Sequence, residues 1–282
     1  MLLEFTKMHG LGNDFIIVND LDAVLDLPAN KIAQLCDRHF GVGADGMIFV
    51  RPATESGAHA YMHYYNADGS QAEMCGNGIR CFAKYLIDKE LVPPGTPKLY
   101  VQTLGGVRSI DVQIDECGTM SSATVDMGEP KLAPSDIPST FEGDIVFQRS
   151  VETSEGSFDV TAVSMGNPHA VIWVDDLDAA PVLTVGPLIE SHDSFPAKTN
   201  VEFAQILDPT RIRLRVWERG VGETQACGTG ACATVVAAVL ASATDERVVV
   251  ELPGGELLIE WQQGGAVFMT GPATHVFEGR VR

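Results

Sequence analysis

The sequence has little positive charge and few cysteines for its 282 residues. Lysine and arginine number 19 against 38 aspartates and glutamates, so the net charge at pH 7 is −19. Such a chain repels nucleic-acid phosphates and anionic membrane surfaces, and we expect neither as a partner. Six cysteines are too sparse for a disulfide-stabilised domain, and a reducing compartment keeps them as thiols.

Long hydrophobic runs are also missing. The longest spans residues 231–241, well short of the roughly 20 residues that a membrane helix needs. Glu4 interrupts the first apolar stretch and no basic segment precedes it, so we expect no secretory signal. These features predict a cytoplasmic globular protein, with enough chain for two domains of roughly 100–150 residues.

The chain contains two similar halves. Cys75 and Cys227 each begin a Cys-Gly-x-Gly segment that precedes an apolar helical stretch, at an offset of 152 residues (75 to 227). A Gly-Asn pair precedes an apolar strand at nearly the same offset, with Asn13 and Asn167 separated by 154 residues (13 to 167). We infer that a duplication produced the chain.

The hydrophobic pattern predicts several strands and one enclosed helix in each half. An alternating strand ends nine residues before each cysteine, at Asn66 and Glu218. Residues 210–217 alternate apolar residues with arginines, which predicts a half-buried strand. Residues 231–241 carry no charge on any side, so this helix must be enclosed. The predicted fold class is α/β (α+β), with two pseudo-symmetric domains, each a curled and mainly antiparallel sheet around a central helix.

Cys75 and Cys227 are candidates for acid/base catalysis. A glycine-rich turn delivers each thiol to the first turn of a helix, where unpaired N–H groups and the helix dipole favour the thiolate. Small glycines also let a carboxylate approach the backbone amides. If the halves face each other across a cleft, one thiolate can remove a proton from a carbon while the opposite thiol supplies one. This arrangement predicts racemisation or epimerisation of an amino acid, with the carbanion stabilised by the helix N-termini.

Other interpretations of the cysteine segments are weaker. Cys81 and Cys232 point away from the first cysteine of their helices, so we interpret both as core residues. That spacing also argues against zinc, and the glycines lack the longer pattern of a dinucleotide site. Lys84 is the nearest lysine for a pyridoxal phosphate Schiff base, but it lies two turns into the helix and is interpreted as a surface residue. We expect no metal and no cofactor.

Two alternative functions stay open at this point. A related cofactor-free racemase acting on another amino acid would differ in its contacts to the distal part of the substrate. A two-lobed amino-acid-binding protein would use the same cleft without chemistry, although it would not need two thiols.

Five segments that span the chain together resemble diaminopimelate epimerases: Lys7–Phe15, Met74–Cys81, Gly166–His169, Glu218–Thr224 and Ala226–Cys232. The resemblance implies cofactor-free interconversion of LL- and meso-diaminopimelate, in lysine and peptidoglycan precursor synthesis, by a homodimer. It also implies that the last strand returns to the first domain. With the turn-forming residues 115–119 taken as the boundary, we expect an N-terminal half of residues 1–118 plus 272–282 and a C-terminal half of residues 119–271.

The resemblance also implies roles for individual residues. Cys75 and Cys227 match the acid/base pair, and His169 and Glu218 match residues that tune the thiols. The groups expected to hold the reacting α-amino-carboxylate are Asn13, Gly76, Asn77, Gly228 and Thr229. The groups expected to hold the distal amino-carboxylate are Asn66, Asn167, Asn200, Glu218 and Arg219. Gly46 is a departure, because some members of the family carry glutamine there.

Overall fold

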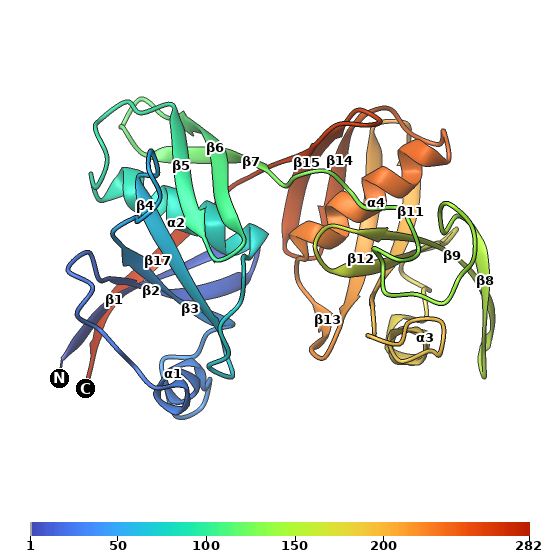
Figure 1. Cartoon of the computed structure of the whole chain (residues 1–282), viewed down its shortest axis with the longest axis horizontal. Coiled ribbons are helices and arrows are strands. Elements are labelled where there is room, and N and C mark those ends of the chain that lie inside the picture. The colour runs from blue at the N-terminus through green and yellow to red at the C-terminus, as the bar shows by residue number, and fades with distance from the viewer. Residues whose placement is uncertain (1) are drawn as a thin grey trace. The chain divides into compact units, whose positions relative to one another are not determined.

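The computed structural model describes residues 2–282, and this chain divides into two compact units. Unit 1 combines the chain up to Asp126 with Thr270–Arg282, and unit 2 is Met127–Met269. The last strand therefore belongs to unit 1, where Leu3 pairs with Val281 and the two chain ends lie side by side (Figure 1). Among the described residues, no helix is long and apolar enough to cross a membrane.

Unit 1 is one sheet with two helices. Its strands are β1 (Leu3–Gly10), β2 (Asn13–Asn19), β3 (Gly46–Arg51), β4 (Ala60–Asn66), β5 (Lys98–Thr103), β6 (Gly106–Ile114), β7 (Met120–Asp126) and β17 (Thr274–Val281). Its helices are α1 (Ala29–Cys36) and α2 (Gly76–Asp88). The described strands pair in the order β17-β1-β2-β3-β4-β5-β6-β7, and within this order the β2–β3 and β4–β5 pairs are parallel. Parallel neighbours need a crossover connection, which α1 and α2 supply.

Unit 2 repeats this topology. Its strands are β8 (Arg149–Thr153), β9 (Gly156–Ser164), β10 (Pro168–Trp173), β11 (Asn200–Asp208), β12 (Arg211–Glu218), β13 (Gly222–Thr224), β14 (Arg247–Leu252) and β15 (Gly255–Trp261), and β16 (Val267–Gly271) leads into unit 1. Its helices are α3 (Val182–Glu190) and α4 (Gly228–Leu240). The parallel pairs are β10–β11 and β12–β14, again joined by the two helices. The prediction of two similar halves is confirmed.

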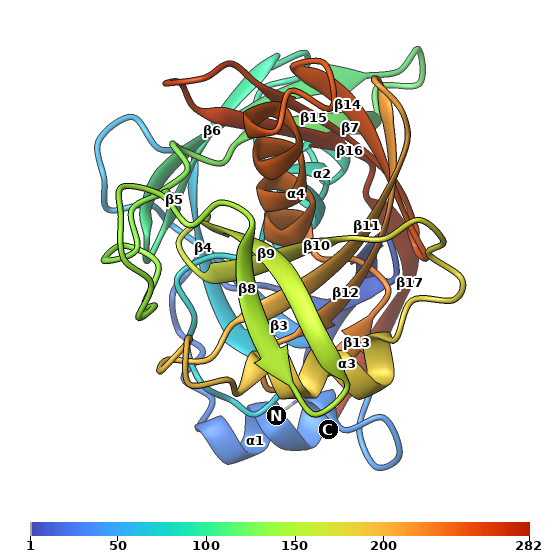
Figure 2. The same ribbon diagram turned by 90° about the vertical axis from the view of Figure 1, so that its right-hand side faces the viewer.

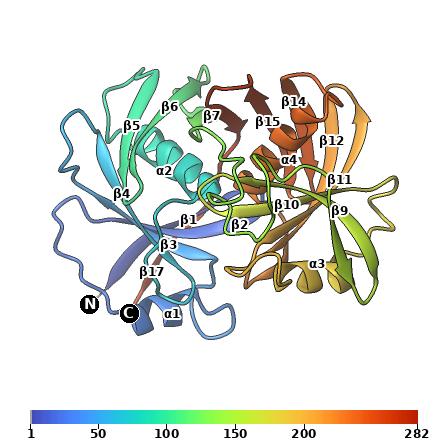
Figure 3. The same cartoon turned by 45° about the vertical axis from the view of Figure 1, so that its right-hand side comes forward.

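Each sheet curls around one central helix. Figure 3 shows α2 against the strands of unit 1, and Figure 2 shows strands of unit 2 around α4. Residues 230–238 of α4 are all buried, as predicted for a helix without charge on any side. Strand β12 alternates as predicted, with its apolar side chains buried and its arginines half-buried. Cys81 and Cys232 are fully buried in the core, as predicted.

Two expectations from the sequence are wrong in detail. Residues 115–119 form the turn of the β6–β7 hairpin, closed by a hydrogen bond from Asp115 N to Thr119 O, so the expected boundary after residue 118 falls inside the sheet of unit 1. The division instead follows Asp126 and Met269. Lys84 is not a surface residue, because its ammonium donates to the carbonyl of Met120 and pairs with Asp88 at 2.9 Å.

Candidate active site

Both predicted catalytic cysteines are N-cap residues of the central helices. Cys75 precedes α2, and its sulfur accepts a hydrogen bond from Gly78 N at 3.4 Å. Cys227 precedes α4 and accepts from Gly230 N at the same distance. Each cysteine has extended backbone angles, so it sits one position before the first helical turn in which it was predicted. The N-terminal N–H groups therefore reach both sulfurs, as a capping side chain requires.

The second glycine of each Cys-Gly-x-Gly segment makes room for a neighbouring strand. A Cβ atom on Gly78 would lie 3.3 Å from Cδ1 of Ile48, and one on Gly230 would lie 2.9 Å from Oε1 of Glu202. Ile48 is on β3 and Glu202 is on the corresponding strand, β11. The repeated glycine therefore serves close helix–strand packing as well as access to the amides.

In unit 1, side-chain amides surround Cys75. The thiol of Cys75 donates toward Oδ1 of Asn13 at 3.7 Å, and Nδ2 of Asn77 donates to the same oxygen at 3.1 Å. Nδ2 of Asn13 donates to Asp45 at 2.7 Å. The structure thus places Asn13 and Asn77, both expected to hold the reacting amino-carboxylate, beside the expected catalytic Cys75, and it adds Asp45 as the hydrogen-bond partner of Asn13.

Arg80 is a supporting residue that the sequence reading missed. It is fully buried, and its guanidinium donates to Gly76 O at 3.1 Å, Asn77 Oδ1 at 3.0 Å and Pro272 O at 3.1 Å. Arg80 therefore fixes the first turn of α2, which carries the expected substrate contacts. The available signal was a lone arginine between Ile79 and Cys81, both of them core residues.

Asn66 and Gly46 are opposite each other in the β3–β4 register. The amide of Asn66 donates to the hydroxyl of Ser70 at 3.0 Å. A Cβ on Gly46 would lie 2.6 Å from the ring of Tyr64 and 2.7 Å from the carbonyl of Tyr65. The departure from glutamine at this position is therefore a packing requirement of this chain.

In unit 2, a chain of polar contacts leads to Cys227. The sulfur lies 3.5 Å from Oγ1 of Thr229, which accepts from Nδ2 of Asn167 at 3.3 Å. Oδ1 of Asn167 lies 3.0 Å from Nε2 of His169, and Nδ1 of His169 lies 2.6 Å from Oε1 of Glu202. Four of these residues were predicted from the sequence.

Glu202 is the second residue that the sequence reading missed. Its side chain and that of His169 are both completely buried. The available signal was an acidic residue between Val201 and Phe203, in the buried part of a strand. A buried carboxyl group requires a polar partner, so an acidic residue at this position predicts a polar contact in the core.

Three of the residues expected to hold the distal group lie at the start of β11 and the end of β12: Asn200, Glu218 and Arg219. The other two lie elsewhere, with Asn66 at the end of β4 in unit 1 and Asn167 directly before β10. Asn200 is buried; its amide donates to Pro168 O at 2.8 Å and accepts from the backbone N–H of Arg219 at 2.9 Å. Asn200 thereby fixes the turn that carries Arg219, whose guanidinium donates to Ala197 O at 3.1 Å. Glu218 accepts from the hydroxyl of Thr224 at 2.5 Å.

The thiolate of Cys227 is not favoured in this conformation, contrary to the expectation from its place at a helix N-terminus. Burial raises the pKa of Cys227 well above its ordinary value, and the carboxyl groups of Glu218 and Glu202 raise it further. Hydrogen bonds from Thr229 and the N–H of Gly230 lower the pKa but do not outweigh burial. Cys227 is therefore a thiol here.

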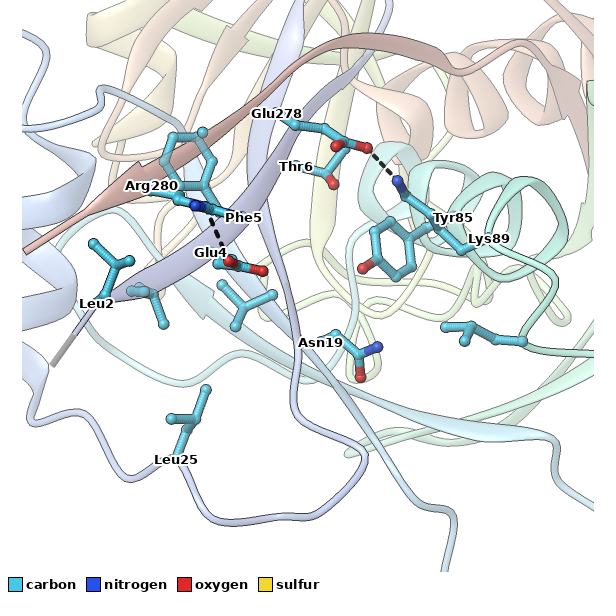
Figure 4. Close-up of a pocket in the computed structure, with 14 residues that line it drawn as sticks. Leu2, Glu4, Phe5, Thr6, Asn19, Leu25, Tyr85, Lys89, Glu278 and Arg280 are labelled. Carbon is cyan, nitrogen blue, oxygen red and sulfur yellow. Dashed lines mark hydrogen bonds and ion pairs between the residues drawn. The ribbon is translucent and has the colours of Figure 1, made fainter.

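A groove in unit 1 lies outside these residues. Figure 4 shows side chains that line it, from β1, β17 and the C-terminal end of α2. Its charged groups form pairs, between Lys89 and Glu278 and, at 2.9 Å, between Arg280 and Glu4. None of the predicted site residues lines it.

Solved structures define the fold class to which the chain belongs. A hydroxyproline epimerase from Agrobacterium vitis superimposes with a TM-score of 0.76 at 15% identity, covering 99% of this chain and 92% of that one. A phenazine biosynthesis protein of the PhzF family from Bacillus anthracis gives a TM-score of 0.73 at 16% identity, covering 100% and 99%. The chain thus has the two-domain fold that these proteins share.

Sequence comparison identifies the particular family within this class. The diaminopimelate epimerase family profile matches residues 5–133 and 161–276. The diaminopimelate epimerase of Pelotomaculum thermopropionicum is 51% identical over 280 residues, 98% of each chain. That of Heliobacterium modesticaldum is 49% identical over 284 residues, 99% of each chain. The chain belongs to the diaminopimelate epimerase family.

Proposed function

We propose that the chain interconverts LL-diaminopimelate and meso-diaminopimelate by a two-base mechanism, with Cys75 and Cys227 as the acid/base pair. One cysteine, as thiolate, takes the α-proton, while the other, as thiol, gives its proton to the opposite face of the same carbon. The substrate leaves with inverted configuration, and the two sulfurs have exchanged protonation states. Neither step needs an electron acceptor or a cofactor.

One observation carries this proposal: the chain, a member of the epimerase family, has a cysteine N-cap on each of two equivalent helices. A single capping cysteine is compatible with a purely structural role, whereas two at equivalent places match a reaction with one acid and one base. The N–H groups at the same helix ends suit the α-carboxylate and the charge that develops beside it.

The substrate contacts are proposed from the family motifs and are compatible with the chemistry of the side chains. Asn13, Gly76, Asn77, Gly228 and Thr229 hold the reacting amino-carboxylate. Asn66, Asn167, Asn200, Glu218 and Arg219 hold the distal one, where a guanidinium pairs with carboxylate and a glutamate accepts from ammonium. His169 and Glu218 tune the thiols.

The inversion of this substrate requires one acid and one base that reach opposite faces of the α-carbon. We propose that each unit supplies one of the two sulfurs, those of Cys75 and Cys227. The raised pKa of Cys227 suits a resting thiol that acts first as the acid.

We also propose that the enzyme is a cytoplasmic homodimer. Val276 and Phe277 on β17 are 50% and 45% exposed, which supplies apolar surface for a second copy. Light scattering on the purified protein should give twice the chain mass, and a monomer at micromolar concentration would rule out this assembly.

Deuterium incorporation tests the reaction, the substrate and the residues together. In D2O, the enzyme should introduce deuterium at the α-carbon of LL-diaminopimelate, and C75A or C227A should abolish turnover while circular dichroism remains unchanged. Turnover at the normal rate in either folded variant would refute the two-base mechanism. Faster exchange on another amino acid in a substrate panel would overturn the assigned substrate.

A further inference from the structure

We propose that Glu202 is a positioning residue that acts through His169 and Asn167 to keep the hydroxyl proton of Thr229 available to the sulfur of Cys227. This inference rests on the proposed function, because it gives Glu202 a role in preparing one of the two thiols. All five residues lie within unit 2 and are joined by the contacts described above.

Burial determines how many protons the Glu202–His169 pair holds. Both side chains are completely buried, and Oε2 of Glu202 has no hydrogen-bond partner in the described part of the chain. A carboxylate beside a neutral imidazole would leave an uncompensated negative charge in the interior, which is costly. One additional shared proton makes the pair neutral. The pKa of Glu202 is raised in the same direction, because burial outweighs His169 and the backbone N–H groups of Glu202 and Ala170, which lower it. With that proton, His169 carries hydrogen on Nε2 as well as facing a proton at Nδ1.

The protonated Nε2 sets the direction of the remaining hydrogen bonds. It donates to Oδ1 of Asn167, so the amide nitrogen of Asn167 faces Thr229. Because the oxygen of Thr229 accepts from that nitrogen, its own hydrogen stays free to point at Cys227 once the sulfur is a thiolate. If the amide of Asn167 were reversed, Thr229 would donate to Asn167, and the thiolate would lose this donor.

Unit 1 provides an internal comparison. Phe15 on β2 and Ile48 on β3 stand where His169 and Glu202 stand on β10 and β11, and both are completely buried. The same topology therefore packs around an apolar pair. Since the fold does not require ionisable groups at these positions, their presence beside Cys227 points to a role in its chemistry.

An ionised carboxyl group at Glu218, at the end of β12, or at Glu202, on β11, raises the pKa of the Cys227 thiol. The shared proton that makes the Glu202–His169 pair neutral removes the contribution of Glu202. Thr229 and the N–H of Gly230 lower the pKa of Cys227. A donor to the thiolate is therefore needed to offset burial and the carboxyl group of Glu218.

Three variants test the proposal: E202I, E202Q and the double variant H169F/E202I, which copies the apolar pair of unit 1. Each is made with C75S, so that the alkylation of Cys227 by iodoacetamide can be followed against pH by peptide mass spectrometry. The same variants with C227S report on Cys75 as the matched control. Turnover is measured with both cysteines present.

We expect E202I and H169F/E202I to raise the pH midpoint of Cys227 alkylation by about one unit, the effect of losing one hydrogen bond to a charged group. The value of kcat/KM should fall roughly 10- to 100-fold. In E202Q the Cys227 midpoint and kcat/KM should both stay close to those of the unchanged protein, because the glutamine amide N–H can replace the shared proton at Nδ1 of His169. The midpoint of Cys75 should not move.

Several outcomes would overturn the inference. An unchanged alkylation midpoint of Cys227 in folded E202I or H169F/E202I would show that the Glu202–His169 pair does not influence this thiol. If E202Q lowered kcat/KM as much as E202I, the effect would come from the negative charge of Glu202 and not from the shared proton. An equal shift in the alkylation midpoint of Cys75 would indicate a general structural effect. If E202I does not fold, the double variant decides in its place. Absence of epimerase activity in the unchanged enzyme would overturn the proposed function, while the Cys227 midpoint would still test the role of Glu202.

Discussion

Ile48 and Glu202 occupy equivalent places in the two copies of the duplicated sheet. Ile48 pairs with Ile17 across the parallel β2–β3 ladder, and Glu202 pairs with Val171 across β10–β11. Each side chain fills the space left by the second glycine of its Cys-Gly-x-Gly segment. The two copies have therefore kept their backbone topology, while the polar groups beneath the two cysteines have diverged.

The two glycines at these contacts should respond differently to an added methyl group. A Cβ in G230A meets the Glu202 carboxyl group, which His169 holds at 2.6 Å, so we expect a loss of about 1–3 kcal/mol in unfolding free energy and a lower kcat/KM. The matched control is G78A, whose nearest atom is the flexible end of Met62 at 3.0 Å. Urea unfolding and turnover of both variants measure the difference. Equal losses in the two variants would contradict this explanation.

Arg80 should matter for both stability and substrate binding. R80M leaves the carbonyls of Gly76 and Pro272 without their buried donor and removes the contact that holds the side chain of Asn77. We therefore expect the unfolding free energy to fall by about 2–4 kcal/mol and KM for the substrate to rise. R247M is the control, because Arg247 forms an exposed pair with Glu260 at 3.1 Å. Chemical denaturation and steady-state kinetics test both effects. Near-normal stability in R80M would contradict this prediction, because it would show that the carbonyls of Gly76 and Pro272 find other hydrogen-bond donors.

The sequence predicted the features that depend on local pattern. The repeated glycine frame identified Cys75 and Cys227, and the uncharged stretch identified the enclosed helix α4. Features that depend on tertiary partners were not predicted. The role of Glu202 depends on its contact with His169, which lies on another strand. The raised pKa of Cys227 depends on burial, which the local sequence does not predict. The turn at residues 115–119 was misread for a related reason, since hairpin turns and linkers have the same composition.

Helix α3 packs closely on β12 at Gly186. A Cβ there would lie 2.7 Å from Cγ of Trp217, and the ring is fixed by a hydrogen bond from Nε1 to Glu190 at 2.8 Å. We therefore expect G186A to cost about 1–3 kcal/mol of stability. G105A is the control, since its Cβ would make only ordinary contact at 3.6 Å. Thermal unfolding compares the two, and a G186A midpoint equal to that of G105A would mean that Trp217 can shift.

Asp14 should make the unfolding free energy depend on pH in the acidic range. Burial by itself raises the pKa of Asp14, but hydrogen bonds from Arg38 at 2.6 Å and from Lys7 outweigh it and lower the pKa from 3.8 to about 2. A carboxyl group whose pKa is lowered by folding contributes stability above its unfolded pKa, and this contribution is lost as the pH falls through the folded pKa.

D14N should therefore be less stable than the unchanged protein by about 1–2 kcal/mol near neutral pH, where Asp14 is ionised in both the folded and the unfolded chain. Between about pH 4 and pH 2 the unfolded chain takes up a proton at Asp14 before the folded protein does. The difference between the two proteins should consequently shrink over this range. Urea unfolding at pH 7, 4 and 3 measures it, and a difference that stayed constant down to pH 3 would show that the ion pairs of Asp14 with Lys7 and Arg38 do not stabilise the fold.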